Sequence, residues 1–384
     1  MSGSILSSPA IMSNVSVAMK VAVIGSGISG AVCASTLARN GVSVTIFDSG
    51  RGPGGRMSQR REVGEDGKEL TFDHGAPFFS VTSPDAMALV HEWESRGFVS
   101  QWKQAFGSFD CASNKFLGVQ QGGDDAKKYV GVPGMNSISK ALCNQSGVES
   151  MFGTGIAKLE WLEEERLPWL LKDSKGENVG RFDGVVASDK NVVSPRFTQV
   201  TGQPPALDLD LIPELATKLQ DIPVRPCFSL MLAFKEPLSL MPAKGLSFKN
   251  SEILSWAHCD STKPGRSTDS ERWILHSTPG YANSVIAKTG LQKLSSETLN
   301  KISEEMFKEF QCSGLVNSLP FLMKAHRWGS AFPAKSIAVE ERCLWDRNRN
   351  LAICGDFCVS PNVEGAILSG LAAASKLLQA SSCL

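Results

Sequence analysis

The sequence predicts an α/β protein in which a parallel-sheet nucleotide-binding domain is interleaved with a smaller α+β domain on a mixed sheet. The segment "KVAVIGSGISG" starts as a short apolar run and continues into glycines, as a buried parallel strand turning into a helix does. A second strand, a glycine-acid turn and a small-residue helix follow at "LAICGDFCVSPNVEGAILSG", near the C-terminus. Because 384 residues exceed one ordinary core, we expect two domains, with the chain returning to the first at its end.

The N-terminal segment has the spacing of a Rossmann-type dinucleotide site. Gly25 permits a tight turn, Gly27 lets the backbone approach a pyrophosphate, and Gly30 lets the helix pack against the strand. The next strand, "VSVTIFD", ends in Asp48, which is placed to accept a hydrogen bond from a ribose 2′-OH. This acid favours FAD or NAD over NADP, and the N-terminus of the helix would hold the phosphates.

The middle of the chain predicts the second half of the same domain, interrupted by short strands. A loop rich in glycine and arginine, "SGRGPGGRMSQRR", leads to a strand at "GKELTFDHGAPFFS", and residues 84–97 have helical periodicity. Alternating patterns between residues 99 and 132 predict short strands of a separate sheet, and a helix is expected to start at Pro133 and stop near Gly147. Consecutive strands follow, the last of which, "FDGVVAS", is apolar like a parallel strand.

The segment from residue 195 to about residue 320 differs in composition and pattern from the rest of the chain, and this difference predicts a substrate domain. It is richer in proline, with strands expected at "PCFSLMLAF", "EILSWAHC" and "RWILHSTP" and an amphipathic helix at "SETLNKISEEMFKEFQ". Beyond it, Gly355 and Asp356 form the second glycine-acid turn. An NAD dehydrogenase needs no such turn, whereas FAD extends far beyond the first phosphate loop, so the turn favours FAD.

These patterns give an expected division of the chain. The predicted parts are an FAD-binding domain at residues 19–80, 131–194 and 326–384, a substrate domain at 81–130 and 195–325, and a tail at 1–18. The tail is rich in serine and contains neither acid nor arginine, so we expect either a disordered segment or a targeting segment.

Four separated motifs resemble one protein family. They are "GSGISG…FDSGRGPGGRM", "FDHGAPFF", "HRWGSAFP" and "CGDFCVSPNVEGAILSG". Together they resemble the FAD-dependent amine-oxidase-like flavoproteins, and most of all their renalase-like branch. The resemblance covers essentially the whole chain from Lys20 onward.

The resemblance implies where non-covalent FAD would bind. Asp48 would hold the adenosine ribose, Arg51 and Arg56 would approach the phosphates and the flavin, and Asp356 would bind the ribityl or phosphate region. The C-terminal helix would direct its N-terminus at the flavin, where a positive dipole end stabilises negative charge. The implied cofactor-binding residues are Gly25, Gly27, Ile28, Ser29, Gly30, Asp48, Ser49, Arg51, Gly55, Arg56, Met57, Ile156, Gly355, Asp356, Glu364, Gly365 and Ala366.

The resemblance also implies an oxidoreductase. Because a flavin accepts a hydride itself, the protein need only position the donor and exclude water. The candidate catalytic residues are Trp328, His326, His276, Trp256 and Phe79, each of which could instead be ordinary core. We expect an oxidase that takes a hydride from a small planar donor of the dihydronicotinamide type and reduces O₂ to H₂O₂. The alternatives are a flavin amine oxidase, a desaturase-like flavoprotein and a non-enzymatic binding protein on the same fold.

The amino-acid composition indicates which kinds of partner the protein is expected to bind. Lys and Arg together number 39, as do Asp and Glu, so no net field attracts nucleic acid or an anionic membrane. The 5 histidines are dispersed and the 10 cysteines lack paired spacing, which favours reduced thiols and no metal site. We expect a small-molecule substrate, such as NAD(P)H or an isomer, and no stable membrane insertion. The expected location is cytoplasmic, with a plastid or mitochondrion as the alternative, and the oligomeric state is left open.

Overall fold

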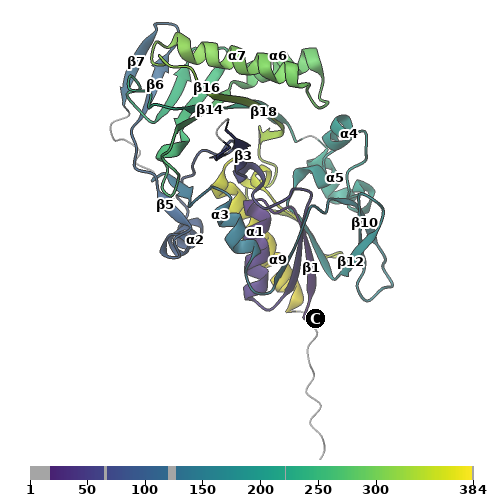
Figure 1. Cartoon of the computed structure of the whole chain (residues 1–384). Helices are drawn as coiled ribbons and strands as arrows, with labels where there is room; N and C mark the ends of the chain where they lie inside the picture. The colour runs from purple at the N-terminus through teal and green to yellow at the C-terminus, as the bar shows by residue number, and fades with distance from the viewer. Residues whose placement is uncertain (1–17, 65–66, 120–126, 221, 383–384) are drawn as a thin grey trace, which may run out of the picture.

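The computed structural model describes residues 18–64, 67–119, 127–220 and 222–382, without the side chains of 330 and 331. The predicted tail therefore lies outside the described residues, apart from residue 18. Figure 1 shows two parts of the molecule, one around β1 and the other around β14.

A six-stranded sheet organises the first part, in the order β19-β20-β13-β1-β2-β9. Its neighbours pair in parallel except β19, which is an antiparallel edge. The strands are β1 (Lys20–Ile24), β2 (Ser43–Asp48), β9 (Val148–Phe152), β13 (Gly184–Ala187), β19 (Leu344–Asp346) and β20 (Leu351–Ile353). Strands from both ends of the chain thus lie in one sheet, as predicted.

Helices cover one face of this sheet and a small sheet covers the other. The helices are α1 (Ile28–Arg39), α3 (Ser137–Cys143) and α9 (Val363–Ser381), which lie side by side in Figure 1. The opposite face packs against β10 (Ile156–Trp161), β11 (Trp169–Asp173) and β12 (Asn178–Phe182), an antiparallel sheet. Small residues bring α1 and α9 together: a Cβ on Gly370 of α9 would collide with the carbonyl oxygen of Ser29 in α1.

A seven-stranded mixed sheet organises the second part, in the order β18-β14-β17-β16-β15-β6-β7. The strands are β6 (Phe106–Asp110), β7 (Lys115–Val119), β14 (Val224–Phe234), β15 (Gly245–Lys249), β16 (Leu254–Cys259), β17 (Glu271–Ser277) and β18 (Leu322–Pro333). Only β6 and β15 pair in parallel. The helices α6 (Pro279–Thr289) and α7 (Ser296–Cys312) lie over one face, at the top of Figure 1, and share a core with the sheet.

Shorter elements connect the two parts. Two-stranded sheets are formed by β3 (Arg60–Val63) with β4 (Glu69–Phe72) and by β5 (Val99–Gln101) with β8 (Tyr129–Gly131). The remaining helices are α2 (Pro84–Ser95), α4 (Arg196–Thr201), α5 (Pro213–Leu219) and the single turn α8 (Asp356–Val359). The 3-10 turns are η1 (Gly55–Met57), η2 (Lys190–Val192), η3 (Leu209–Leu211) and η4 (Asp260–Thr262).

The predicted helix at Pro133 was wrong at its start. Residues 133–136 form turns and α3 begins at Ser137. The carboxylate of Asp73 accepts a hydrogen bond from the backbone N–H of Met135 (3.0 Å), and Gly134 N–H donates to the Ser137 hydroxyl. Tertiary contact with Asp73 therefore holds these residues outside the helix.

Two expected domain boundaries cut across structural units. The strand β18 starts at Leu322, so a boundary at residue 326 falls inside it. The segment 195–222, which the sequence groups with the substrate domain, packs through Leu207, Ile212 and Leu219 into the core under the six-stranded sheet. The division into domains stays a proposal. In its revised form β18 belongs to the substrate domain, and the segment that contains Leu207, Ile212 and Leu219 belongs to the FAD-binding domain.

Candidate functional site

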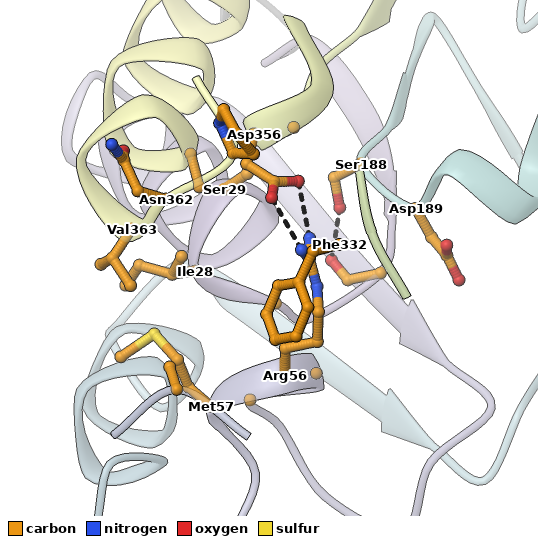
Figure 2. A pocket seen from close by; sticks show the side chains of 18 of the residues that line it. Ile28, Ser29, Arg56, Met57, Ser188, Asp189, Phe332, Asp356, Asn362 and Val363 are labelled. Atoms are coloured by element: carbon orange, nitrogen blue, oxygen red, sulfur yellow. Dashed lines mark hydrogen bonds and ion pairs between the residues drawn. The ribbon is translucent and has the colours of Figure 1, made fainter. Parts of the chain in front are cut away.

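A cavity of about 630 Å³ opens where β1, β2 and β13 end. Carboxyl ends of parallel strands are where α/β sheets bind ligands. The walls come from segments far apart in sequence: the glycine turn before α1, the loop after β2, residues 76–80, the loop after β13, the end of β18, and residues 355–366. Figure 2 shows lining side chains that come from distant parts of the sequence, such as Ile28, Arg56 and Asp356.

The glycine turn leaves its backbone open to the cavity. Gly25 has φ of +104°, a conformation that favours glycine. A Cβ on Gly27 would meet no described atom within 4 Å, so a ligand could approach the chain closely there. A Cβ on Gly30 would instead collide with the carbonyl oxygen of Gly25. Gly27 thus faces the cavity, whereas Gly30 does not line it and serves packing.

The N-terminus of α1 is a ready anion site. Gly27 is its N-cap, and no described side chain caps the helix there. The first N–H groups of a helix lack partners within it and carry the positive end of its dipole. Because Ile28 and Ser29 also line the cavity, a phosphate placed here would receive these donors.

Asp48 lines the cavity and also fixes the turn. Its carboxylate accepts hydrogen bonds from the N–H (2.8 Å) and hydroxyl (2.5 Å) of Ser26 and from Gly50 N–H (2.7 Å). A carboxylate has about four acceptor positions, so capacity for a hydroxyl group remains. Its contact with a ribose stays a prediction.

Arg56 and Asp356 form a two-pronged ion pair across the cavity, drawn with dashed lines in Figure 2. The guanidinium nitrogens donate to the two carboxylate oxygens over 2.7 and 2.6 Å. The guanidinium carbon also lies 5.6 Å from the centre of the Phe332 ring. Burial disfavours the charge on Arg56, but the carboxylate of Asp356 outweighs it and raises the pKa of the guanidinium.

The loop after β13 supplies a wall that the sequence analysis missed. Ser188, Asp189, Lys190 and Asn191 all line the cavity, and the Ser188 hydroxyl donates to the carbonyl oxygens at residues 24 and 25 (2.9 and 2.8 Å). Burial and the neighbouring Arg56 lower the pKa of Lys190 to about 7. The position of this loop could have predicted it. The loop follows the apolar run "FDGVVAS", which forms the strand that pairs in parallel with β1, so it lies beside the first glycine turn.

Aromatic side chains form a further wall of the cavity. Phe78, Phe79, Trp328 and Phe332 line it. The indole N–H of Trp328 donates to the carbonyl oxygen of His74 (3.0 Å), which fixes the ring plane.

The predicted histidines lie near this wall but do not line the cavity. The rings of His74 and His326 are 4.8 Å apart, and each is within 5.0 Å of the Trp328 ring. His276 lies beside them, with Nε2 3.2 Å from the carbonyl oxygen of His74. Burial lowers the pKa of His74 to about 3 and those of His276 and His326 to about 4, so all three rings are neutral near pH 7.

Several other predicted residues lie outside the cavity. Trp256 sits in an aromatic group with Phe78, their rings 5.9 Å apart. The carboxylate of Glu364 accepts hydrogen bonds from the backbone at residues 82 and 83 (2.7 and 2.6 Å), ahead of α2, and therefore does not face the cavity. Those that do not line it are Gly30, Arg51, Ile156, Trp256, His276, His326, Glu364 and Gly365.

The remaining predicted residues do line the cavity. They are Gly25, Gly27, Ile28, Ser29, Asp48, Ser49, Gly55, Arg56, Met57, Phe79, Trp328, Gly355, Asp356 and Ala366. Sequence reasoning also missed Phe332, Pro361, Asn362 and Val363. The role of each of the predicted residues that line the cavity stays a prediction.

The chemistry of the cavity fits FAD. An uncapped helix N-terminus, an open glycine backbone and the cations of Arg56 and Lys190 suit a diphosphate. Asp48 suits a ribose hydroxyl, and the aromatic wall suits a flat ring system. The volume also falls within the range of about 300–1,000 Å³ found for small-molecule sites.

Two family profiles match the chain. The one described as NAD(P)-binding Rossmann-like domain matches residues 23–93, and the one described as flavin containing amine oxidoreductase matches residues 82–378. The second match covers more than half of the chain. Among curated proteins, a 4,4'-diapophytoene desaturase (4,4'-diaponeurosporene-forming) of Staphylococcus haemolyticus (strain JCSC1435) is 39% identical over 80 residues. Those residues are 21% of this chain and 15% of that protein.

Solved structures share the fold over nearly the whole chain. An oxidoreductase from Methanosarcina mazei has a TM-score of 0.63 and 12% identity, covering 92% of this chain and 99% of its own. A triple mutant of putrescine oxidase has a TM-score of 0.64 and 12% identity, covering 94% of this chain and 99% of its own. At these identities the likeness shows the fold alone. Among the described residues, no helix is long and apolar enough to cross a membrane.

Proposed function

Because this chain belongs to the flavin-containing amine oxidoreductase family, we propose that it oxidises a small planar donor of the dihydronicotinamide type. The chain is an FAD-dependent oxidoreductase. In the proposed reaction a hydride leaves the dihydronicotinamide ring, which becomes the aromatic cation. The two electrons and the proton of this hydride, together with one proton from solvent, reduce O₂ to H₂O₂. FAD supplies the hydride acceptor. The renalase-like branch of the family is part of this proposal, supported by the motifs "HRWGSAFP" and "RWILHSTP".

The observation that carries this proposal is the aromatic wall of the cavity. Phe78, Phe79 and Trp328 line it with flat apolar surfaces. The carbonyl oxygen of His74 accepts a hydrogen bond from the Trp328 indole N–H, and a Cβ on Gly75 would lie 2.9 Å from the indole ring. The indole therefore has little free space on the side of Gly75. A flat donor ring can therefore stack against a fixed surface that also excludes water.

The carboxylates around the cavity already bind other groups of the protein. Among the described lining residues the carboxylates are Asp48, Asp189 and Asp356, and each already accepts hydrogen bonds from the protein. Asp356 in particular is paired with Arg56 through both oxygens. Asp48 and Asp189 accept their hydrogen bonds from uncharged N–H and hydroxyl groups, so amines stay in the panel of donors tested below.

The neutral histidines suit direct hydride loss. A dihydronicotinamide needs no base to release a hydride, because its ring nitrogen carries the resulting charge. His74, His276 and His326 have pKa values of about 3, 4 and 4, and so remain neutral as that positive charge develops. They thus act as positioning residues behind Trp328, and they do not oppose the product cation.

Oxygen consumption tests this proposal. The FAD-loaded protein is mixed in air with NADH, NADPH, their ring isomers and a panel of amines, and O₂ loss and H₂O₂ gain are recorded. We expect turnover with at least one dihydronicotinamide, one H₂O₂ formed per O₂ used, and a marked loss of turnover in Trp328→Ala. Turnover with none of the dihydronicotinamides would overturn the proposal.

Amine oxidation is the second candidate, favoured by the description of the matched family. It predicts turnover with amines alone in the same assay. A desaturase-like activity has weaker support, because the aligned desaturase matches over only 15% of its own length.

A further inference from the structure

One buried histidine has no part in the proposed reaction. His258 on β16 is fully buried and does not line the cavity of the candidate site, so it cannot contact a donor there. Its ring instead accepts a hydrogen bond from Trp256, with 3.2 Å between the indole Nε1 and the imidazole Nδ1. Trp256 lies two positions earlier on the same strand, and residues two apart share one face of a strand. The two side chains are therefore neighbours on one face of the sheet.

The hydrogen bond fixes which nitrogen of His258 carries a proton. An indole nitrogen only donates, so the Nδ1 of His258 accepts and carries none. Burial and the nearby charge of Lys263 lower the pKa of His258 well below its ordinary value, so the ring is neutral and its proton is on Nε2. This Nε2 lies 3.8 Å from an oxygen of Asp260, a buried carboxylate that lies 2.6 Å from the ammonium group of Lys263. A carboxylate beside the protonated nitrogen favours this tautomer, in which His258 accepts from Trp256.

Close packing also holds the ring of Trp256. It stacks on the Phe106 ring, with 6.1 Å between the ring centres, and meets the Phe78 ring edge-on at 5.9 Å. A Cβ on Gly245 would collide with the Phe106 ring and lie 3.1 Å from the Trp256 ring. The glycine on β15 thus leaves room for both rings. Trp256 is half-buried, so its place depends on these contacts and on the bond to His258.

Trp256 connects His258 to the aromatic wall of the cavity. Phe78 lines the cavity, and its ring contacts those of Trp256 and Phe106 at 5.9 and 5.6 Å. Trp328, which also belongs to this wall, is held by a hydrogen bond from its indole N–H to the carbonyl oxygen of His74. An indole hydrogen bond therefore fixes a ring in the wall at Trp328 and a ring beside the wall at Trp256.

We propose that His258 is a positioning residue for the donor: by accepting the indole N–H it holds Trp256 against Phe78 and so fixes the wall on which a flat donor stacks. This inference rests on the proposed function. Without the acceptor the indole N–H loses its partner, and Phe78 loses a fixed neighbour. The donor then binds less tightly, whereas hydride transfer in the bound complex changes little, because the flavin itself accepts the hydride.

Two substitutions of His258 separate the acceptor from the packing. His258→Leu has a similar volume but no acceptor, whereas His258→Asn is smaller but carries an amide oxygen that can take the place of Nδ1. We expect His258→Leu to raise the KM for the donor about fivefold, with kcat within about twofold of the wild type, as the loss of one hydrogen bond predicts. His258→Asn should keep a KM close to that of the wild type. Packing alone would predict the opposite order, because the smaller side chain leaves a void.

Trp256→Phe tests the same bond from its other end and adds no buried polar group. It keeps an aromatic ring but removes the indole N–H, so it should raise the KM to a similar extent. Combining it with His258→Leu should cause no further rise, because both substitutions remove one shared interaction. The matched control is Trp161→Phe, since this half-buried tryptophan lies on β10 and does not line the cavity. Its KM should equal that of the wild type.

A spectroscopic measurement tests the hydrogen bond without a donor. The chain has 8 tryptophans, and the FAD-loaded protein labelled with ¹⁵N in these residues gives a separate indole N–H signal for each. Trp256→Phe removes one signal and so assigns it. In His258→Leu we expect this signal to shift and its proton to exchange with water faster than in the wild type. Because this readout needs no turnover, its failure differs from that of the proposed function, which would appear as turnover with none of the dihydronicotinamides.

The kinetic comparison uses whichever compound of the panel the wild-type protein oxidises. The proposal is overturned by an unchanged Trp256 indole signal in His258→Leu or by an unchanged KM in Trp256→Phe. A rise in KM in His258→Asn as large as that in His258→Leu would also overturn it, because packing would then explain both. If His258→Leu does not fold, Trp256→Phe and His258→Asn still decide the outcome.

Discussion

Arg56 is the side chain whose change should affect cofactor binding most directly. It carries a half-buried positive charge in the cavity and holds Asp356 through two hydrogen bonds. Arg56→Ala should weaken FAD binding by about tenfold or more, because hydrogen bonds to charged groups contribute roughly 1.5–3 kcal/mol. Titration of FAD into the apoprotein, followed by the change in flavin fluorescence, measures this.

The matched control is Arg61→Ala, since that exposed arginine on β3 does not line the cavity. It should bind FAD like the wild type. Equal affinities for the two variants would show that Arg56 makes no contact with the cofactor.

Lys190 predicts a pH dependence of FAD binding. Its pKa of about 7 lies below the ordinary value because of burial and the nearby Arg56. Above pH 7 the side chain is therefore neutral in the apoprotein, and a bound diphosphate would have to restore its proton. Affinity for FAD should fall as the pH rises above 7, by up to about tenfold per pH unit.

The sign of this effect can be checked in two ways. Lys190→Met should bind FAD with little dependence on pH in the same range. The apoprotein itself should gain stability as the pH rises from about 7 towards 10, because the unfolded chain then holds the proton that the buried lysine has lost. A wild-type affinity for FAD that does not change with pH would argue against contact between Lys190 and the phosphates.

At the scale of elements, the glycines of the turn and helix after the first strand differ in role: Gly27 leaves space for a ligand, whereas Gly30 allows close packing. A Cβ on Gly27 would project into open space, so Gly27→Ala should fold with unchanged stability but bind FAD about tenfold or more weakly. A Cβ on Gly30 would collide with the Gly25 carbonyl, so Gly30→Ala should lose about 3 kcal/mol of stability. Thermal unfolding of the two apoproteins, together with FAD titration, separates these effects. Equal destabilisation by both substitutions would contradict the assignment.

The elements that the sequence predicted best are those with strong local patterns. The parallel strands around Gly25 and at "FDGVVAS", the strands of the substrate part and the amphipathic helix α7 are confirmed. The helices α4, α5 and α6 were not predicted, because they are short or pack through few apolar residues. The start of α3 was wrong because Asp73, 62 residues from Met135, decides it.

The same distinction between local patterns and tertiary contacts explains which cavity residues could be predicted from the sequence. Residues in motifs, such as Arg56 and Asp356, line the cavity, but their mutual ion pair depends on two short helical turns, η1 and α8, that lie 300 residues apart. Lys190 follows a strand without any motif, and its position in the cavity results from the strand order of the sheet. Conversely, Glu364 belongs to a motif but binds the backbone before α2, a contact that no local pattern reveals.

At the scale of the whole molecule, the cavity joins segments from both ends of the chain. Its walls include Gly25, Lys190, Trp328 and Asp356, which lie on different elements. A ligand that contacts all of them should stabilise the native state as a unit. At a free FAD concentration of about 100 times Kd, the gain is about 2.7 kcal/mol.

Removal of FAD should therefore lower the Tm by several degrees, and adding it back should restore the Tm in proportion to the logarithm of FAD concentration. Calorimetry of the same preparation with and without FAD measures this. A Tm that does not respond to FAD would contradict binding across these segments.

The most direct test of the central claim is an anaerobic titration of the FAD-loaded protein, followed by the visible absorbance of the flavin. We predict that a dihydronicotinamide, either the ordinary form or a ring isomer, bleaches the flavin at one equivalent per site and that admitting O₂ restores the colour. Bleaching by amines alone, or by no compound in the panel, would contradict the account.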